Sequence, residues 1–386
     1  MLRILVDENI PATQHYLGAL GTVTCVNGRT LSPSQLQGID VLLVRSVTRV
    51  DEALLCDSEV KFVGTATSGF DHIDRAYLAA RGIGFAHAPG SNANSVVEYV
   101  LAAIAAVGEQ LENLLAGGVV GIAGYGNIGK ALAARLGALG IEYRIYDPWL
   151  DQGTIPHAST LSDVLGCDVV SLHTELTTRL PWPSYHLLGQ RELQSLRPET
   201  LLINASRGPV VSNAALLEAL QTGRGPVKTV LDVWEGEPQV NAELLERVAL
   251  GSAHIAGYSL DGKVLATRML RDAVCAHLML PSSSTESPLA QAPLPDIGQE
   301  LSGASLIRAL VHCRYDIRID DQLLRQIVAH DKPEYDVGKA FDGLRKSYRE
   351  RRELAGSIVN GSRLQPQQLA LVQALGCVVT GAGMCT

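Results

Sequence analysis

The chain has 386 residues, of which 46% are hydrophobic and 19% charged, a composition typical of a folded protein that is too long for a single core. With 40 acidic and 32 basic residues the net charge is −8, which argues against a surface for nucleic acid or anionic membranes. The seven cysteines are scattered and form no C-x-x-C pair, so we expect no disulfide framework, no metal site and a reducing, cytoplasmic compartment. The most apolar stretch, around residues 99–107, is too short to cross a bilayer.

The first hundred residues predict alternating strands and helices. Short apolar runs at residues 3–6, 41–44, 61–64 and 83–86 are separated by helical or turn segments. The runs do not alternate polar and apolar residues, which is typical of parallel strands covered on both faces. They predict a first α/β unit, and an Ala- and Val-rich stretch at 95–109 predicts a long helix leading out of it.

A second unit of the same kind is predicted from about residue 118. A strand at 118–123 is followed by a helix at 130–140, which ends at a glycine, and by a strand at 142–146. Further elements are strands at 168–172, 200–204 and 229–233 and a helix at 213–222. This alternation is typical of a doubly wound parallel sheet.

The composition changes near residue 281. A Pro- and Ser-rich run at 281–295 predicts a linker, followed by helical segments, a basic stretch at 345–352 and a last helix and strand within 367–380. The predicted fold class is α/β, with two doubly wound parallel-sheet domains, Rossmann-like or flavodoxin-like, and a smaller C-terminal α+β domain. The predicted domain bounds are 1–95 with 258–280, 96–257, and 281–386.

A glycine-rich loop joins the predicted strand at 118–123 to the helix after it. In Gly124-Tyr-Gly-Asn-Ile-Gly129 the first glycine allows a tight turn, Gly126 lets the backbone approach a pyrophosphate, and the last permits close packing of helix on strand. The helix N-terminus offers free N–H groups to phosphates. Asp147 ends the next strand, where its carboxylate would accept ribose hydroxyls and repel a 2′-phosphate. The sequence therefore predicts an NAD site, the alternative being a glycine turn without a ligand.

Three polar residues follow three successive predicted strands of this unit. Arg207, Glu237 and His254 would meet at the sheet edge where the carboxyl ends of parallel strands bind ligands. An arginine fork grips a carboxylate, a histidine takes a hydroxyl proton, and a carboxylate orients that histidine. The set suits hydride removal from a carbon that carries a hydroxyl next to a carboxylate. Taken singly, each residue has a structural explanation: a salt bridge, a solvated loop or a capped turn.

Longer motifs resemble a known family. The stretches Gly124-Tyr-Gly-Asn-Ile-Gly129, Asn204-Ala-Ser-Arg-Gly208, Leu231-Asp-Val-Trp-Glu-Gly-Glu-Pro238 and His254-Ile-Ala-Gly-Tyr258 are similar to those of D-2-hydroxyacid dehydrogenases. Narrower motifs at 44–48, 62–69, 341–348 and 351–353 resemble the members that oxidise 4-phospho-D-erythronate. The resemblance implies NAD-dependent oxidation of this phosphorylated hydroxy acid to 2-oxo-3-hydroxy-4-phosphobutanoate, in pyridoxal 5′-phosphate synthesis, by a homodimer built through its C-terminal domain.

The resemblance also implies roles for individual residues. Arg207, Glu237 and His254 would be the catalytic set. Ser46, Thr67 and Tyr258 would contact the substrate. The implied cofactor contacts are Gly124, Gly126, Asn127, Ile128, Gly129, Asp147, Thr174, Ala205, Ser206, Arg207, Asp232 and Gly257. Arg45 is a candidate for the substrate phosphate, whereas Arg351 and Arg352 are weaker candidates, because a basic run is usually a solvated helix face.

Two other functions stay open from the sequence. A dehydrogenase for another D-2-hydroxy acid, such as 3-phosphoglycerate, would use the same catalytic residues, although phosphoglycerate dehydrogenases commonly carry a different tail. An NAD(H)-sensing protein similar to the family's corepressors would bind the cofactor with little turnover. The acidic balance and the tail motifs argue against this second alternative.

Overall fold

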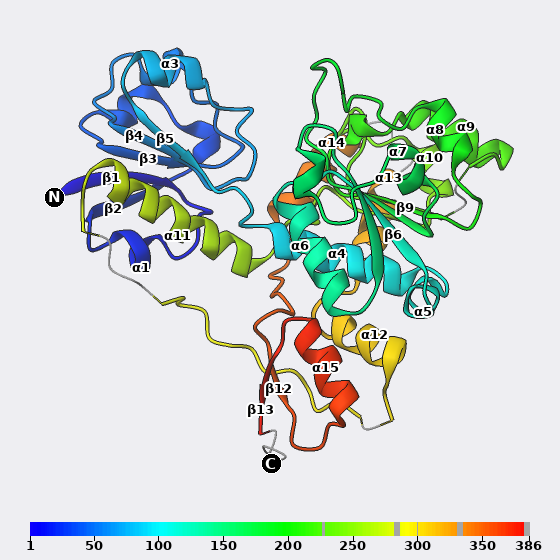
Figure 1. Cartoon of the computed structure of the whole chain (residues 1–386). Coiled ribbons are helices and arrows are strands. Elements are labelled where there is room, and N and C mark those ends of the chain that lie inside the picture. The colour runs from blue at the N-terminus through cyan, green and yellow to red at the C-terminus, as the bar shows by residue number, and fades with distance from the viewer. Residues whose placement is uncertain (226–227, 282–285, 299, 330–334, 382–386) are drawn as a thin grey trace. The chain divides into compact units, whose positions relative to one another are not determined.

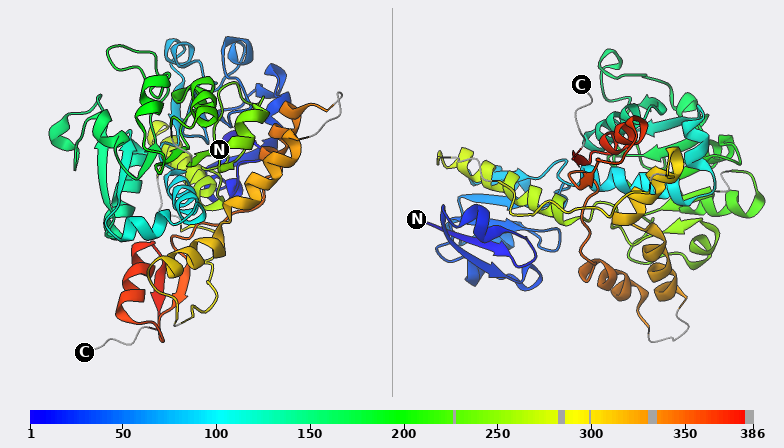
Figure 2. Two further views of the ribbon diagram at one scale, coloured as in Figure 1. Left: turned by 90° about the vertical axis from the view of Figure 1, so that its right-hand side faces the viewer. Right: turned by 90° about the horizontal axis from the view of Figure 1, so that it is seen from below.

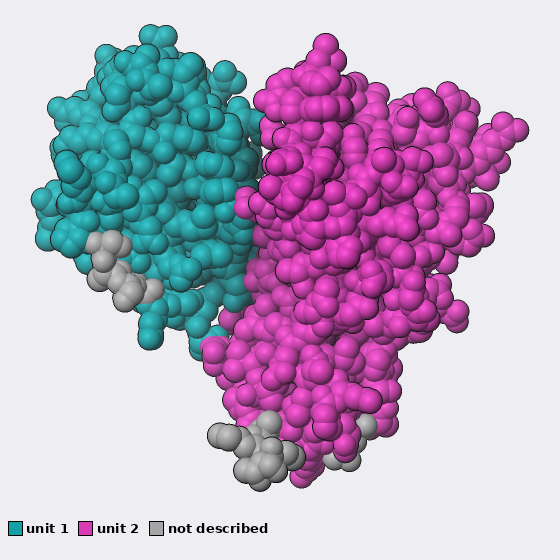
Figure 3. Space-filling model, viewed as in Figure 1, with its two compact units in different colours: residues 1–92, 259–290 teal, residues 93–258, 291–386 magenta. Residues whose placement is uncertain are grey.

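The computed structural model describes residues 1–225, 228–281, 286–298, 300–329 and 335–381 (Figure 1). The chain forms two compact units, one of residues 1–92 and 259–290 and one of residues 93–258 and 291–386 (Figure 3). Residues 282–285 of the predicted linker lie outside the described residues. Across the described ranges, no helix is long and apolar enough to cross a membrane.

The first unit is a parallel sheet of five strands in the order β2-β1-β3-β4-β5. The strands are β1 (Leu2–Asp7), β2 (Gly21–Val26), β3 (Val41–Val44), β4 (Phe62–Thr65) and β5 (Gly84–His87). One face packs on α1 (Thr13–Leu17) and α11 (Leu260–His277), the other on α2 (Glu52–Leu55) and α3 (Arg75–Ala80). Short 3-10 turns span Gly28–Thr30 and Pro33–Leu36.

Four strands of this sheet were predicted, and the edge strand β2 was not. The buried strand β3 carries four fully apolar residues, the pattern expected of a covered parallel strand. β2 instead mixes threonines with valines and is largely exposed or half-buried, because it has a neighbour on one side only. A search for continuous apolar runs misses such a strand.

The second unit contains a parallel sheet of six strands in the order β11-β10-β9-β8-β6-β7. The strands are β6 (Val119–Ala123), β7 (Glu142–Tyr146), β8 (Val169–Leu172), β9 (Leu201–Asn204), β10 (Lys228–Leu231) and β11 (Leu250–Gly251). One face packs on α4 (Ala93–Ala106), α5 (Gln110–Leu115) and α6 (Asn127–Ala138). The other packs on α7 (Leu161–Leu165), α8 (Gln190–Ser195), α9 (Asn213–Thr222) and α10 (Ala242–Arg247). Further 3-10 turns span Gln152–Thr154 and Gly208–Val210.

The helix predicted at 95–109 ends earlier in the structure, at Ala106. Gly108 has a φ of +59°, a left-handed conformation that interrupts the helix before α5 begins at Gln110. The helix α9 and the strand β7 have the predicted bounds. The two α/β sheets predicted from the sequence are thus confirmed.

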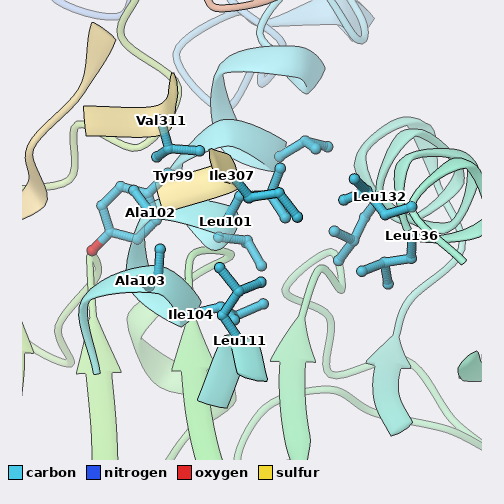
Figure 4. Close-up of a cluster of buried hydrophobic side chains, with 14 of the residues drawn as sticks. Tyr99, Leu101, Ala102, Ala103, Ile104, Leu111, Leu132, Leu136, Ile307 and Val311 are labelled. Carbon is cyan, nitrogen blue, oxygen red and sulfur yellow. The ribbon is translucent and has the colours of Figure 1, made fainter. Parts of the chain in front are cut away.

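The C-terminal segment packs on the helices and sheet of the second unit. Its elements are α12 (Gly303–Arg314), α13 (Ile317–Val328), α14 (Val337–Lys346), β12 (Ile358–Asn360), α15 (Pro366–Ala374) and β13 (Val378–Thr380). The strands β12 and β13 pair in parallel, and α15 lies beside α12 (Figure 2). Ile307 and Val311 of α12 join the hydrophobic cluster that contains Tyr99 and Ala102 of α4 (Figure 4). The proposed boundary between a cofactor domain at 96–257 and a C-terminal domain from 281 stays a prediction.

The basic stretch at 345–352 is not a solvated helix face. The helix α14 ends at Lys346, and the rest of the stretch is irregular. Arg351 is only 3% exposed, because its guanidinium donates to the backbone oxygens of Ser95 and Ala256. The expectation of a solvated helix face was wrong, because the backbone oxygens that Arg351 binds lie far away in the sequence.

Candidate active site

The glycine loop has the backbone shape that its sequence predicts. Gly124 has a φ of +96°, and an added Cβ there would lie 2.6 Å from the His173 oxygen. A Cβ on Gly129 would lie 2.0 Å from the oxygen of Gly124, so helix α6 and the loop pack too closely for a side chain. At Gly126 an added Cβ would meet no atom of the described residues within 4 Å. The first and last glycines are therefore needed by the fold, whereas the middle one leaves the space above the helix N-terminus open.

Asp147 lies beside this loop at the end of β7. Its carboxylate accepts the backbone N–H of Tyr125 at 2.8 Å and that of Trp149 at 3.0 Å. These bonds fix the acidic side chain at the rim of a cavity of about 350 Å³. The cavity is lined by Gly124, Tyr125, Gly126, Lys130, Tyr146, Asp147, Pro148, Trp149, Leu150, His173, Thr174, Glu175, Thr177, Arg179, Trp182, Pro183, Ser184 and Leu187.

Two polar atoms of this cavity fit a bound dinucleotide. The Thr174 hydroxyl and Nδ1 of His173 are buried and have no hydrogen-bond partner within the described part of the chain. Burial lowers the pKa of His173 to about 3, so the ring stays neutral. Buried polar groups in proteins are normally paired, and a ligand in the cavity can supply the missing partners. The residues present therefore fit NAD, with Gly126 and the α6 N-terminus open to its phosphates.

Some cavity residues were not predicted as cofactor contacts. Arg179 lies with its guanidinium carbon 3.9 Å from the ring centroid of Trp149, and the ring of Trp182 meets Trp149 edge to face at 5.3 Å. Trp149 follows Asp147 closely, so it could have been found from the sequence. Arg179 and Trp182 belong to the irregular segment after β8, and no motif marks them.

Glu237 and His254 form the centre of the predicted catalytic set. Nδ1 of His254 lies 2.5 Å from Oε1 of Glu237, and the two side chains are 30% and 27% exposed. The other Glu237 oxygen accepts the backbone N–H of Trp234 at 3.2 Å. Burial raises the pKa of Glu237, but the hydrogen bond and charge of His254 outweigh it, and the pKa lies below its ordinary value. The carboxylate thus stays ionised and orients the imidazole, whose Nε2 is left for another proton partner.

The loop that carries His254 is held by Asp232. The backbone oxygen of Asp232 accepts the His254 N–H at 2.7 Å. The Asp232 carboxylate accepts the Ser252 hydroxyl at 2.6 Å and the N–H groups of Ile255 and Ala256 at 2.8 and 2.9 Å. His254 itself has a φ of +56°, a strained backbone that this set of bonds maintains. Asp232 therefore positions the loop that carries His254, and its predicted contact with the cofactor stays a prediction.

Arg207 follows β9 on a turn packed against the Glu237 loop. An added Cβ on Gly208 would lie 2.1 Å from the backbone carbon of Trp234, so the two backbones touch. Asn204 fixes the turn, because its Oδ1 accepts the Ser206 N–H and hydroxyl and its Nδ2 donates to the Arg207 oxygen. The guanidinium donates to the Ser206 oxygen at 2.8 Å and is half-buried. The turn that carries Arg207 therefore lies side by side with the loop that carries Glu237.

The predicted substrate contacts are divided between the two units. Ser46 and Thr67 follow β3 and β4, which are neighbours in the first sheet. The Thr67 hydroxyl donates to the Gly69 oxygen at 2.7 Å, which shapes its loop. Tyr258 belongs to the second unit, and its ring meets that of Tyr348 edge to face at 5.6 Å. The roles of these three residues stay predictions.

Comparison with known proteins agrees with the fold and the predicted family. Residues 103–256 match the model of the D-isomer specific 2-hydroxyacid dehydrogenase, NAD binding domain. Residues 289–376 match a domain of unknown function, DUF3410. The matched domain is the NAD-binding domain of D-2-hydroxyacid dehydrogenases, and the prediction of NAD as cofactor is confirmed.

Full-length relatives identify the group more closely. Erythronate-4-phosphate dehydrogenases of Cellvibrio japonicus, Klebsiella pneumoniae strain 342 and Escherichia coli K12 are 46%, 43% and 42% identical to the chain. These matches cover 91%, 97% and 91% of this chain and 93%, 98% and 92% of the relatives. The chain belongs to the erythronate-4-phosphate dehydrogenase family.

Solved structures share the fold. A protein of Thermus thermophilus matches with a TM-score of 0.61 and 25% identity, over 72% of this chain and 97% of that one. The D-lactate dehydrogenase of Aquifex aeolicus, solved with NAD and lactic acid, matches with a TM-score of 0.55 and 22% identity, over 72% of this chain and 96% of that one.

Proposed function

We propose that this protein oxidises 4-phospho-D-erythronate at C2 to 2-oxo-3-hydroxy-4-phosphobutanoate, with NAD as the acceptor, in the synthesis of pyridoxal 5′-phosphate. The observation that carries the proposal is the Glu237–His254 pair at 2.5 Å in a chain whose full-length relatives bear the name of this activity. The pair supplies a proton acceptor, as oxidation of a hydroxyl requires. A protein that only senses NAD(H) would have no need of it.

Each of the proposed catalytic residues has a separate role in this oxidation. His254 accepts the proton of the C2 hydroxyl at Nε2, while Glu237 holds Nδ1 and stabilises the imidazolium that forms. Arg207 binds the C1 carboxylate and polarises the C2 oxygen. Bound NAD supplies the hydride acceptor, so C2 loses a hydride and its hydroxyl loses a proton as the C=O bond forms. Reduction of the 2-oxo acid uses the same groups in reverse.

The cofactor residues follow from the cavity. The N–H groups at the start of α6, around Asn127 and Ile128, would bind the pyrophosphate across Gly126. Asp147 would accept the adenosine ribose hydroxyls, and Thr174 would bind through its unpaired hydroxyl. The remaining proposed contacts lie in the catalytic loops: Ala205, Ser206, Arg207, Asp232 and Gly257.

The assembly and compartment are part of the same proposal. We infer a homodimer built through residues 281–386, in the cytoplasm. Six of the cysteines, Cys25, Cys56, Cys167, Cys275, Cys313 and Cys377, are free thiols, which supports a reducing compartment. Light scattering of the purified chain would give the mass of a dimer, and a concentration-independent monomer mass would contradict this part of the proposal.

A substrate panel tests the proposed activity. The purified protein would be assayed for NAD reduction with 4-phospho-D-erythronate, 3-phosphoglycerate and D-lactate. We expect kcat/KM for 4-phospho-D-erythronate to exceed the others by at least about 100-fold, since a lost phosphate or a shortened chain removes contacts made in the transition state. Robust turnover of another acid with no oxidation of 4-phospho-D-erythronate would refute the assignment. Tight NADH binding with no turnover of any acid would favour a sensor.

A further inference from the structure

Helix α14 of the C-terminal segment packs directly on the loop that follows Glu237. An added Cβ on Gly338 would lie 2.5 Å from Nε2 of Gln239 and 3.3 Å from Cγ of Pro238. Phe341, one turn further on, is 1% exposed and belongs to the hydrophobic cluster that includes Trp234. These contacts fix the position of α14 against the catalytic loop.

Near the end of this helix, Arg345 has an incompletely paired guanidinium group. Its Nε is buried and has no hydrogen-bond partner within the described part of the chain, and its Nη1 lies 3.8 Å from Oδ1 of Asp342. The guanidinium carbon lies 5.9 Å from the ring centroid of Tyr258, and the side chain is 28% exposed. Arg345 lies on the helix that packs on the loop after Glu237, and its charge is among those that lower the pKa of Glu237.

The neighbouring basic residues differ from Arg345 in their exposure or in the partners of their guanidinium groups. Arg349 pairs with the buried carboxylate of Asp320. Arg351 has an unpaired Nε like that of Arg345 within the described part of the chain, but its guanidinium donates to two backbone oxygens and the residue is only 3% exposed, so a ligand cannot reach it. Lys346 is exposed. Arg345 therefore combines partial exposure, an unpaired buried donor and a position beside Tyr258, on the helix that packs on the loop after Glu237.

The proposed substrate needs such a group. It carries a carboxylate at one end, which Arg207 would bind, and a phosphate at the other, which needs donors of its own. Guanidinium groups bind phosphate through two parallel hydrogen bonds, and a partly buried site strengthens them. We propose that Arg345 binds the phosphate of the substrate beside Tyr258, so that the C-terminal segment selects phosphorylated acids in the active site of its own chain. This inference rests on the proposed function.

Two substitutions at Arg345 and one control test it. Arg345→Met keeps most of the side-chain stem and removes the charge, Arg345→Lys keeps the charge, and Lys346→Met changes the exposed neighbour. The assay compares kcat/KM for 4-phospho-D-erythronate with that for D-erythronate, which lacks the phosphate. We expect Arg345→Met to lower the first value by about 30- to 100-fold, the size of a lost charge-assisted contact, and the second by less than about threefold. Arg345→Lys should recover part of the loss, and Lys346→Met should change neither value.

An equal loss on both substrates would overturn the proposal, because it would mean that Arg345 acts only through Glu237. Inorganic phosphate provides a second readout. It should inhibit the wild-type protein competitively against the acid substrate, with an inhibition constant about tenfold higher for Arg345→Met. If the wild-type protein oxidises a different 2-hydroxy acid, the proposed function fails, and inhibition of that reaction by phosphate still tests Arg345. Equal inhibition of wild type and variant would then reject the phosphate role.

Discussion

The second unit contains two clusters of charged side chains that differ in their access to solvent. In the catalytic cluster, His254 and Glu237 are 30% and 27% exposed. In the second cluster, which we call the clamp (Glu98, Asp320 and Arg351), the residues are 4%, 5% and 3% exposed. The clamp joins the C-terminal segment to α4 and to the loop after His254. In the catalytic cluster, by contrast, Nε2 of His254 is left for a proton partner outside the pair.

The clamp is built from hydrogen bonds between distant segments. Arg351 donates to the Ser95 oxygen at 2.6 Å and to the Ala256 oxygen at 3.3 Å, and its guanidinium carbon lies 4.0 Å from the ring centroid of Tyr315. Asp320 accepts the hydroxyls of Tyr315 and Tyr348 at 2.9 and 3.0 Å. Ser95 and Ala256 lie within three residues of two of the three points where the chain passes between the units.

The difference in solvent access between the two clusters indicates two different roles for charged side chains. A charged group whose partners all belong to the protein holds segments together, and breaking its bonds costs stability. A charged group with an open side can exchange a proton with a ligand. The catalytic cluster should therefore control turnover and the clamp should control folding, and the substitutions below test this division.

The largest effect is expected from His254→Ala. Turnover should fall by about 10²- to 10⁴-fold, the usual contribution of a general base, while NADH affinity measured by fluorescence titration changes little. The matched control is His186→Ala, because His186 forms a similar pair with Glu235 at 2.6 Å and 35% exposure but lies outside the catalytic set. A collapse of NADH affinity with turnover preserved would show that the role of His254 is misassigned.

In the clamp, Arg351→Met should act on stability instead. The substitution keeps the apolar stem but removes two charge-assisted hydrogen bonds, so the free energy of unfolding should fall by about 2–3 kcal/mol in urea titrations. Arg191→Met, at an exposed position of α8, should change it by less than about 0.5 kcal/mol. Unchanged stability in Arg351→Met would remove the distinction between the two clusters.

A smaller effect is expected at the cofactor cavity. Asp147→Ala should raise the KM for NAD by about tenfold, because one charge-assisted bond to the ribose is lost. Combining it with Pro148→Arg should shift the preference towards NADP. Asp151→Ala is the control, since that side chain only caps an exposed 3-10 turn. Unchanged discrimination between NAD and NADP in the double variant would count against Asp147 as the ribose contact.

The smallest effect concerns the pH dependence of stability through Glu98. Burial raises the pKa of this carboxyl from 4.5 to about 7, although it accepts the N–H groups of Leu354 and Ala355 at 2.8 and 2.9 Å. Because the folded state holds the proton more tightly, the contribution of Glu98 to stability is largest below the unfolded pKa and is lost as the pH rises through about 7. Glu98→Gln cannot ionise and should flatten this decline in thermal unfolding series. An unchanged decline would show that other groups cause it.

Features that depend on neighbouring residues were predicted from the sequence, whereas those that depend on distant contacts were not. The glycine loop and Asp147 could be predicted because strand, loop and helix are contiguous. Arg207, Glu237 and His254 were selected because each follows a strand, and the structure shows the pairing of the last two. The positions of Arg345 and Arg351 could not be predicted, because Tyr258 beside Arg345 and the Ser95 and Ala256 oxygens bound by Arg351 lie more than 80 residues earlier in the chain.

The most direct test follows the hydrogen at C2. The substrate would be 4-phospho-D-erythronate deuterated at C2, incubated with NAD and the wild-type protein, and the products would be analysed by mass spectrometry and NMR. The proposed function predicts that deuterium leaves the acid and is recovered in NADH, in step with formation of the 2-oxo acid. Deuterium retained at C2 of the product, or released to water without NADH formation, would contradict it.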